Sequence, residues 1–512
     1  MPATNSRKLV ISASKCVQKH VYSIGPFGAR VSFASQQRRA LNLVWALKTL
    51  GTWPKVERPR AIIIGGGIAG LTVAAALHLQ DCAVWVVEGE GGLLTLQRRA
   101  GHRRVHPSVN FWPEEPLSWT TRLPFFDWYA DTCPTVVSAL DGYWSTYFDE
   151  HMSEVILNKE FAGFAPTKGD EITLKFKDGS REKADMVFLT TGFGPEKDLT
   201  DPKEQSYWFD DEFDDEISDT KLQWIVSGTG DGGLIDALRI TYPGFMTDEM
   251  ALQLLQVEDS ESFRASVIAI EEEAQDIAND KVRSRFYQKK YTAIARNLSR
   301  KAKALFPALP SKRKPVQLIG RLEYPFDLTS APVHKIILAY SLHENRITYH
   351  SGDLVKLAGE KYGIRRGRVP IEELTYDKII IRHGAKPPLW SFLKKKEVEK
   401  LRADQLRLGD YLEVEDLVGV ISQDEFYAKM PYAPGRTSHP EEFAKRRVDL
   451  ARELMRKRFG TGIKLLGDKF EIVVSDAEAV DCKKGKWNIP TQLFGIDLLP
   501  ATGTTPVMKD LV

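Results

Sequence analysis

Residues 60–92 limit the possible folds of this chain more than any other segment. They comprise an apolar run at 61–64, the spaced glycines Gly65, Gly67 and Gly70, an Ala-rich run up to Leu79, and a second apolar run at 83–87. A short apolar run that stops at a glycine-rich turn predicts a buried strand, and the Ala-rich run predicts a helix. The segment therefore predicts a strand, tight loop, helix and strand of a parallel α/β sheet.

The glycine spacing also predicts a ligand. Gly65 permits the tight turn, Gly67 lets the backbone approach a pyrophosphate, and Gly70 lets the helix lie close to the strand. The helix N-terminus offers free N–H groups and the positive end of the helix dipole to phosphates. Glu88, at the end of the second strand, can accept hydrogen bonds from the ribose hydroxyls of an adenosine. We therefore expect a dinucleotide here.

A second glycine pattern lies in residues 221–240. A strand expected at 222–226 is followed by Gly228, Gly230 and Gly233, and a helix is expected from about Leu234. Asp231 stands inside this loop, where its carboxylate would repel a pyrophosphate unless the side chain points away.

The second unit is expected to contain a helical insertion. Residues 247–309 are charged and helix-prone, and the next apolar strand is expected only at 315–321. Arg321 then stands at the strand end that selects the adenosine ribose, where a cation accommodates a 2′-phosphate and favours NADP over NAD. A surface arginine at a strand end is an equally good interpretation.

The order of these motifs resembles the flavoproteins with two dinucleotide-binding domains, of the thioredoxin reductase and flavin monooxygenase type. The resemblance covers residues 60–389. Two further segments carry it: 172–194, whose Thr190-Thr191-Gly192 is similar to the family's ATG motif, and 346–384, which ends at Gly384. It implies FAD in the first site, NAD(P)H in the second, and cofactor contacts from Thr191, Gly192 and Gly384. The implied fold is α/β: an FAD-binding Rossmann-like domain interrupted by an NAD(P)-binding Rossmann-like domain with a helical insertion.

The chain departs from that family in three ways. It has no CxxC, no FxGxxxH, and no late Gly-Asp segment after an apolar strand, since Gly409-Asp410 lacks that strand. The chemistry is therefore less constrained than the cofactors.

A small-molecule substrate is expected in an aromatic-rich region after the second strand. His106 and Asn110 are the polar residues of the segment 104–113, and His106 would exchange a proton near neutral pH. The aromatic residues of this region are Phe111, Trp112, Trp119, Phe125, Phe126, Trp128, Tyr129 and Trp144. A structural role for His106, Asn110 and these rings is the alternative, because polar groups in apolar surroundings are usually satisfied structurally.

Composition excludes some partners and leaves others open. The net charge of +2 gives no reason to expect nucleic acid or a membrane surface, and the four cysteines lack metal-ligand spacing. No metal site is expected, and the acidic run 208–219 is interpreted as a solvated loop. The first 56 residues contain nine Lys or Arg and no Asp or Glu. This acid-poor, basic start makes organelle targeting the alternative. The sparse cysteines suit a reducing compartment, so we expect a cytoplasmic protein, and homo-oligomerisation is left open.

Four segments are expected: a basic N-terminal arm with a helix (1–59), the FAD domain (60–220), the NAD(P) domain (221–390) and a mixed C-terminal region (391–512). The expected function is an NAD(P)H-linked, FAD-dependent oxidoreductase that passes hydride from nicotinamide to flavin and on to a substrate or oxygen. Two alternatives stand beside it. One is an FAD oxidase of an amine or amino acid, and the other is a catalytically silent dinucleotide-binding sensor or assembly protein.

Overall fold

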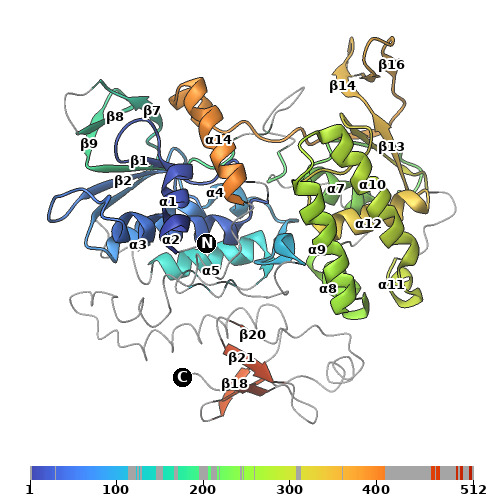
Figure 1. Ribbon diagram of the computed structural model, residues 1–512, viewed down its shortest axis with the longest axis horizontal. Coiled ribbons are helices and arrows are strands. Elements are labelled where there is room, and N and C mark those ends of the chain that lie inside the picture. Colours follow the sequence, from blue (N-terminus) through green and yellow to red (C-terminus); the bar gives the residue numbers. More distant parts are fainter. Residues whose placement is uncertain are drawn as a thin grey trace.

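The computed structural model contains two parallel β-sheets that carry helices (Figure 1). It describes residues 3–28, 30–113, 121, 123, 126, 128, 130–145, 154–166, 171–194, 196, 206–208, 216–217, 219–242, 245, 247–258, 260–306, 313–359, 361–409, 463–466, 469–472, 492–493, 496–499 and 507–509. The architecture is α/β, as the glycine patterns predict.

The first sheet is parallel throughout and has the order β1-β10-β2-β3-β6. These strands are β1 (Val21–Ser23), β10 (Met186–Leu189), β2 (Arg60–Ile64), β3 (Ala83–Val87) and β6 (Glu154–Ile156). Helix α3 (Ile68–His78) follows β2 and is buried along almost its whole length. The predicted strand, loop, helix and strand of residues 60–92 are confirmed, because the local apolar runs and glycines determine them.

The N-terminal segment belongs to this sheet. Strand β1 pairs with β10 in parallel, with Val21 opposite Val187, and forms the sheet edge. Helix α2 (Phe33–Thr49) begins at a capping box formed by Ser32 and Ser35 and packs on α3. Helix α1 (Ala3–Ser14) packs on α2. The expected boundary between an arm and a domain at 59/60 therefore does not coincide with the edge of the sheet.

The second sheet has the order β13-β12-β11-β17 and is also parallel. Its strands are β13 (Ile347–Ser351), β12 (Val316–Gly320), β11 (Trp224–Ser227) and β17 (Lys378–Ile381). Helix α7 (Asp231–Thr241) follows β11, and α12 (Pro332–His343) follows β12. The predicted displaced strand is confirmed, because β12 lies beside β11 with Gln317 opposite Ile225.

Both units carry a small antiparallel sheet before their last parallel strand. In the first unit it is formed by β7 (Phe161–Phe164), β8 (Ile172–Phe176) and β9 (Arg181–Ala184). In the second it is formed by β14 (Asp353–Lys356), β15 (Tyr362–Arg365) and β16 (Glu372–Glu373), which project from the upper right of Figure 1. The strand order β6-β3-β2-β10 of the first unit thus matches β13-β12-β11-β17 of the second.

The helical insertion is confirmed as α8 (Thr247–Glu258), α9 (Glu261–Gln275), α10 (Asp280–Asn297) and α11 (Arg300–Ala304). A buried ion pair fixes it to α12: Lys335 Nζ lies 2.9 Å from Glu271 Oε2, and both side chains are almost fully buried. The hydroxyls of Tyr287 and Tyr291 also donate to Glu271. These aromatic and charged contacts make the insertion part of the second core.

The connecting segments complete the described chain. Between β3 and β6 lie α4 (Thr95–Arg98), β4 (Arg104–Val105), η1 (Val109–Phe111), β5 (Asp131–Thr132) and α5 (Cys133–Trp144). After β17 come α13 (Leu389–Phe392) and α14 (Lys395–Gly409), and α14 packs on α1.

The strands described in the C-terminal region are β18 (Ile463–Leu466), β19 (Lys469–Ile472), β20 (Gln492–Leu493), β21 (Ile496–Leu499) and β22 (Val507–Lys509). They form an antiparallel sheet. The sequence favours alternating segments at 469–474 and 491–499, where β19, β20 and β21 lie, and a helix at 440–459, which is outside the described residues.

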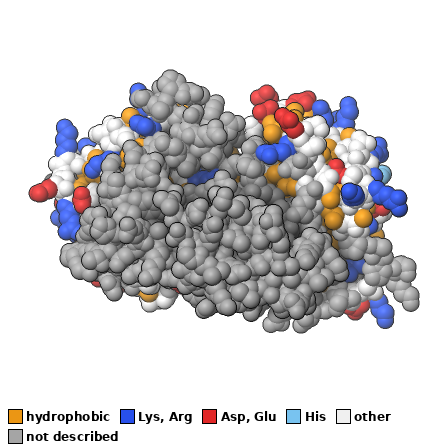
Figure 2. Space-filling model, turned by 90° about the horizontal axis from the view of Figure 1, so that it is seen from below, with side chains coloured by type: hydrophobic (Ala, Val, Ile, Leu, Met, Phe, Trp, Pro, Cys, Tyr) orange, Lys and Arg blue, Asp and Glu red, His pale blue; other side chains and the backbone are white. Residues whose placement is uncertain are grey.

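The described surface carries both signs of charge, as the near-neutral composition predicts. Basic and acidic side chains both appear on the part of it that Figure 2 shows. No helix within the described ranges is long and apolar enough to cross a lipid bilayer.

Candidate dinucleotide-binding sites

The first glycine loop is shaped by two close backbone contacts and one open position. A Cβ on Gly65, whose φ is +113°, would lie 2.6 Å from the carbonyl oxygen of Thr190, and one on Gly70 would lie 1.9 Å from that of Gly65. A Cβ on Gly67 would meet nothing within 4 Å. The first and third glycines are therefore required by packing. The open space at Gly67 would let a ligand approach the backbone closely.

Glu88 reaches this loop from the end of β3. Its Oε2 accepts a hydrogen bond from Gly66 N at 2.6 Å, and its Oε1 accepts one from Glu90 N at 2.8 Å. A carboxylate has further lone pairs on both oxygens. Glu88 is thus held beside the loop with acceptor capacity left for a pair of ribose hydroxyls.

The end of β10 closes the first loop. Thr190 Oγ1 donates to the carbonyl oxygens of Ile64 and Gly65, at 2.9 Å each. Gly192 has a φ of +62° and open space around its missing Cβ. The sequence predicts Thr191 and Gly192 as cofactor contacts, and the structure adds Thr190 as the residue that ties the strand end to the loop.

The second loop repeats this geometry. A Cβ on Gly228, whose φ is +130°, would lie 2.0 Å from the carbonyl oxygen of Arg382, and one on Gly233 would lie 2.2 Å from that of Gly228. Gly230 again has nothing within 4 Å. Gly384 has a φ of +76° and open space, as Gly192 does. Each glycine of the second pattern therefore has a geometric counterpart in the first.

Asp231 does not obstruct the second loop. Its Oδ1 accepts a hydrogen bond from Ala331 N at 2.9 Å and lies 2.5 Å from His334 Nδ1, both at the start of α12. Burial raises the pKa of this carboxyl, but contact with His334 outweighs that effect and the pKa lies below its ordinary value. The charge that the sequence places beside a phosphate is thus compensated by the N-terminal end of α12.

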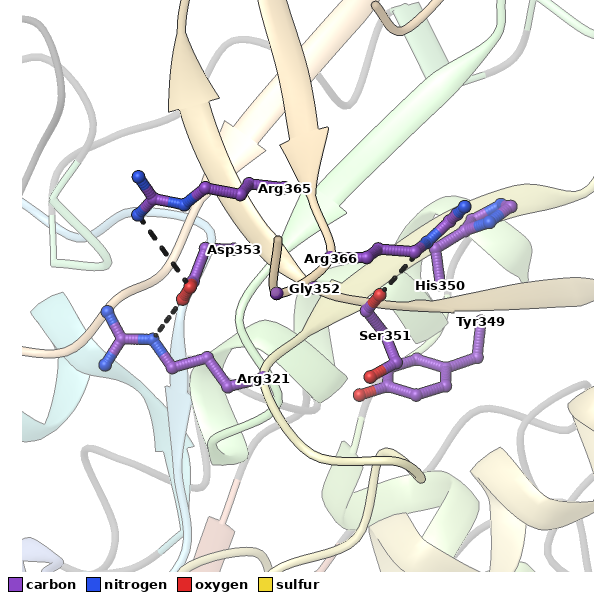
Figure 3. A pocket seen from close by; sticks show the side chains of 9 residues that line it. Arg321, Tyr349, His350, Ser351, Gly352, Asp353, Arg365 and Arg366 are labelled. Carbon is purple, nitrogen blue, oxygen red and sulfur yellow. Dashed lines mark hydrogen bonds and ion pairs between the residues drawn. The ribbon is translucent and has the colours of Figure 1, made fainter. Parts of the chain in front are cut away.

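The end of β12 forms a basic pocket (Figure 3). Arg321 directly follows β12, as Glu88 directly follows β3, and its Nε donates to Asp353 Oδ1 at 2.9 Å. The guanidinium of Arg365 approaches the other oxygen of Asp353 at 4.0 Å. Arg366 Nε donates to the carbonyl oxygen of Ser351 at 3.2 Å. Arg365 and Arg366 are basic residues of this pocket that sequence reasoning missed, because β14 and β15 bring them to Arg321.

A buried ion cluster joins the two units that carry the parallel sheets. Asp236 of α7 is fully buried, and its carboxylate accepts hydrogen bonds from Arg103, which precedes β4, and from Arg382, which ends β17. Arg382 Nε lies 2.7 Å from Asp236 Oδ2. Burial raises the pKa of Asp236, but Arg103 and Arg382 outweigh it and lower the pKa to about 2. No local sequence pattern points to this cluster, since its members are far apart in the chain.

The predicted catalytic residues lie in a structured turn. His106 is buried, and its Nδ1 accepts hydrogen bonds from Ser108 N at 3.2 Å and Val109 N at 3.0 Å. The carbonyl oxygen of Asn110 accepts a hydrogen bond from Arg30 at 3.4 Å. An Nδ1 that accepts two N–H groups is unprotonated, so the proton of a neutral imidazole stands on Nε2. Their catalytic role stays a prediction.

Four aromatic residues of the expected substrate region fill cores. Trp112, Phe126, Trp128 and Trp144 are almost fully buried. Phe126 stacks on Trp144, and Trp128 donates from Nε1 to Gln37 at 2.9 Å. Trp119, Phe125, Tyr129 and most of the acidic run 208–219 lie outside the described residues. The structural interpretation of the four buried rings is therefore the better supported one.

Comparison with known proteins gives structural resemblance without sequence relatives. No protein-family model and no curated protein matches the chain. Among solved structures, bacillithiol disulfide reductase from Staphylococcus aureus matches 66% of this chain and 80% of its own, at 10% identity and a TM-score of 0.38. A steroid monooxygenase bound to NADP matches 66% and 72%, at 14% identity and 0.35. Thioredoxin reductase from Lactococcus lactis matches 64% and 78%, at 12% identity and 0.32. By name, these neighbours are two reductases and a monooxygenase, and TM-scores this low indicate that only part of the geometry is shared.

Proposed function

We propose that the protein is an NAD(P)H-linked, FAD-dependent oxidoreductase. The observation that carries the proposal is the repeated loop geometry: Gly67 and Gly230 both have open space at the carboxyl ends of parallel strands, and packing fixes the glycines on either side of each. Dinucleotides bind at this edge of open α/β sheets. Two such sites in one chain favour two dinucleotides over one.

The residues at the first loop fit FAD. Gly67 and the N-terminus of α3 would hold the pyrophosphate, and Glu88 would hold the adenosine ribose. Thr191 and Gly192 stand on the neighbouring strand end, where the backbone has room for the rest of the cofactor. A bound flavin would supply hydride transfer, while this chain positions it and excludes water.

The residues at the second loop fit NAD(P)H. Gly230 and the N-terminus of α7 would hold the pyrophosphate, since Asp231 is engaged with α12. The pocket at the end of β12 brings together Arg321, Arg365 and Arg366. Two carboxylates, Asp353 and Glu372, pair with these arginines, so one positive charge remains in excess. That excess of positive charge favours a ribose 2′-phosphate, and so NADP.

The decisive test is the absorption spectrum of the purified protein before and after anaerobic addition of NADPH. Flavin bands that bleach with NADPH are the expected result. Flavin bands that bleach only with an amine or amino acid would replace the proposal by an oxidase. A bound dinucleotide with no NAD(P)H consumption would replace it by a sensor or assembly protein.

His106 and Asn110 are proposed as the polar residues that face the substrate. His106→Asn keeps an acceptor at the position of Nδ1 and so preserves the turn, but it removes the proton of Nε2. We expect this variant to bind flavin normally and to lose turnover. Full turnover in His106→Asn would leave His106 with a structural role only. Asn110→Asp is the matched variant for the second residue.

A further inference from the structure

One arginine of the N-terminal helix is sealed inside the first unit. Arg39 of α2 is only 6% exposed. The loop after β1 lies directly against it: a Cβ on Gly25 would be 2.6 Å from Arg39 Cδ, and one on Gly28 would be 2.2 Å from Nη2. Two glycines thus make room for a guanidinium that water barely reaches.

This arginine has no counter-charge within the described part of the chain. Its Nε and Nη1 have no hydrogen-bond partner there. Burial alone lowers the pKa of Arg39 to about 10, with no carboxylate acting on it. The group therefore stays protonated at neutral pH. Arg103 and Arg382 are buried to a similar degree, but unlike Arg39 both contact the carboxylate of Asp236. A buried cation without such a partner is strongly unfavourable.

A small cavity lies beside the guanidinium, between α1, α2 and α14. Asn42 and Ser14 line it with Arg39, and Asn42 Nδ2 also lacks a partner. Gln405 lines the same cavity but is already engaged, since its Oε1 accepts from Phe27 N and its Nε2 donates to the Ser23 carbonyl oxygen. The polar groups left for an occupant include the unpartnered donors of Arg39 and Asn42, among the apolar side chains of Val10, Ile24 and Leu408.

We propose that this cavity binds a small monovalent anion, a halide or a short carboxylate such as formate, held by Arg39 and Asn42. An anion accepts hydrogen bonds from both donors and neutralises the guanidinium, which water can do only in part. The cavity volume of about 10 Å³ admits a small anion and excludes larger tetrahedral oxyanions. The proposed anion site contains no residue of the two glycine loops. The loop of Gly25 and Gly28 follows β1 and so lies at the same edge of the first sheet as the first glycine loop.

The test is the melting temperature of the full-length protein as chloride replaces gluconate at constant sodium and ionic strength. A ligand that binds only the folded state raises the melting temperature by mass action. We expect a rise of about 2–4 °C between about 1 and 300 mM chloride. Formate should act in the same way, and sulfate should not.

Matched variants locate the effect. Arg39→Met should lose the chloride dependence, whereas Arg38→Met removes the same charge one residue earlier on α2 and should keep it. Asn42→Leu should weaken chloride binding about tenfold, through loss of one hydrogen bond to an anion. If Arg39→Met does not fold, the wild-type titration and a crystal soaked in bromide still decide the matter. Anomalous scattering beside Arg39 is the expected result.

Three outcomes would overturn the proposal. The first is a wild-type melting temperature that chloride and formate leave unchanged. The second is a chloride effect of equal size in Arg39→Met, which would mean that the anion binds elsewhere. The third is a bromide-soaked crystal in which a carboxylate of this chain, rather than bromide, contacts Arg39.

Discussion

The two units that carry the parallel sheets share a loop geometry and differ in the residue at the strand end beside it. In both, the first and third glycines pack against a backbone carbonyl and the second is open. The first unit places Glu88 after its second strand, and the second unit places Arg321. Packing therefore preserves the loop geometry, while the charge at the strand end beside it is reversed.

The largest expected effect separates the two loops. Gly67→Leu fills the open space of the first loop, and we expect it to abolish FAD binding. Gly230→Leu fills only the second loop. The protein should therefore still bind FAD and be yellow, but NADPH should no longer reduce it. Absorption spectra with and without NADPH distinguish the two variants. Gly142→Ala, in the open position of helix α5, is the control and should load flavin normally. Normal flavin content in Gly67→Leu contradicts the assignment of the first site.

The next effect concerns the contact between the units. Asp236→Asn removes the buried carboxylate that Arg103 and Arg382 share, while Glu196 stays 3.7 Å from Arg382 Nη1. We expect a loss of about 3–5 kcal/mol in the free energy of unfolding. Denaturant titration measures it. The Lys361→Met variant, which breaks the exposed pair with Glu373, should cost about 0–1 kcal/mol and is the control.

The same carboxylate gives a pH dependence. The pKa of Asp236 is lowered to about 2 in the folded protein, against about 4 in an unfolded chain. Its stabilisation is therefore complete above about pH 4 and is lost as the pH falls toward about 2. The difference in unfolding free energy between wild type and Asp236→Asn should shrink over that range. A difference that stays constant over this range would show that the pKa of Asp236 in the folded protein lies outside it.

Smaller effects are expected at the third glycines. Gly70→Ala and Gly233→Ala each place a methyl group against a carbonyl oxygen of the same loop. We expect each substitution to lower the free energy of unfolding by about 1–3 kcal/mol through overpacking, and the two losses to be similar. Thermal unfolding measures this. A large loss in one variant and none in the other would mean that the two loops are less alike than their geometry indicates.

The smallest effect concerns the choice of nicotinamide cofactor. Arg321→Ala should lower the preference for NADPH over NADH about tenfold, the value of one charge-assisted hydrogen bond. Asp353→Asn should raise the preference, since it frees Arg321 and Arg365 from their carboxylate. Steady-state kinetics with both nucleotides provide the measurement. An unchanged preference in Arg321→Ala would remove the argument for NADP.

The sequence predicts what short segments determine. The two glycine loops, the strands beside them and the displaced strand β12 follow from local patterns of apolar residues and glycines. The first strand does not, because three residues, Val21 to Ser23, carry no pattern and pair with a strand far along the chain. The side chain of Asp231 points away from its loop because it contacts His334, which is far away in the sequence. The basic pocket and the Asp236 cluster are hidden for the same reason.

The place of β1 at the edge of the first sheet has a consequence for synthesis. Val21 leaves the ribosome long before Val187, its partner in β10. At a translation rate of about 5–20 residues per second, the delay is on the order of ten seconds. Strand β1 is therefore synthesised early but can pair only after β10, the last parallel strand of its sheet along the chain, has been made. A nascent chain stalled before residue 186 would hold an unpaired edge that another chain could occupy.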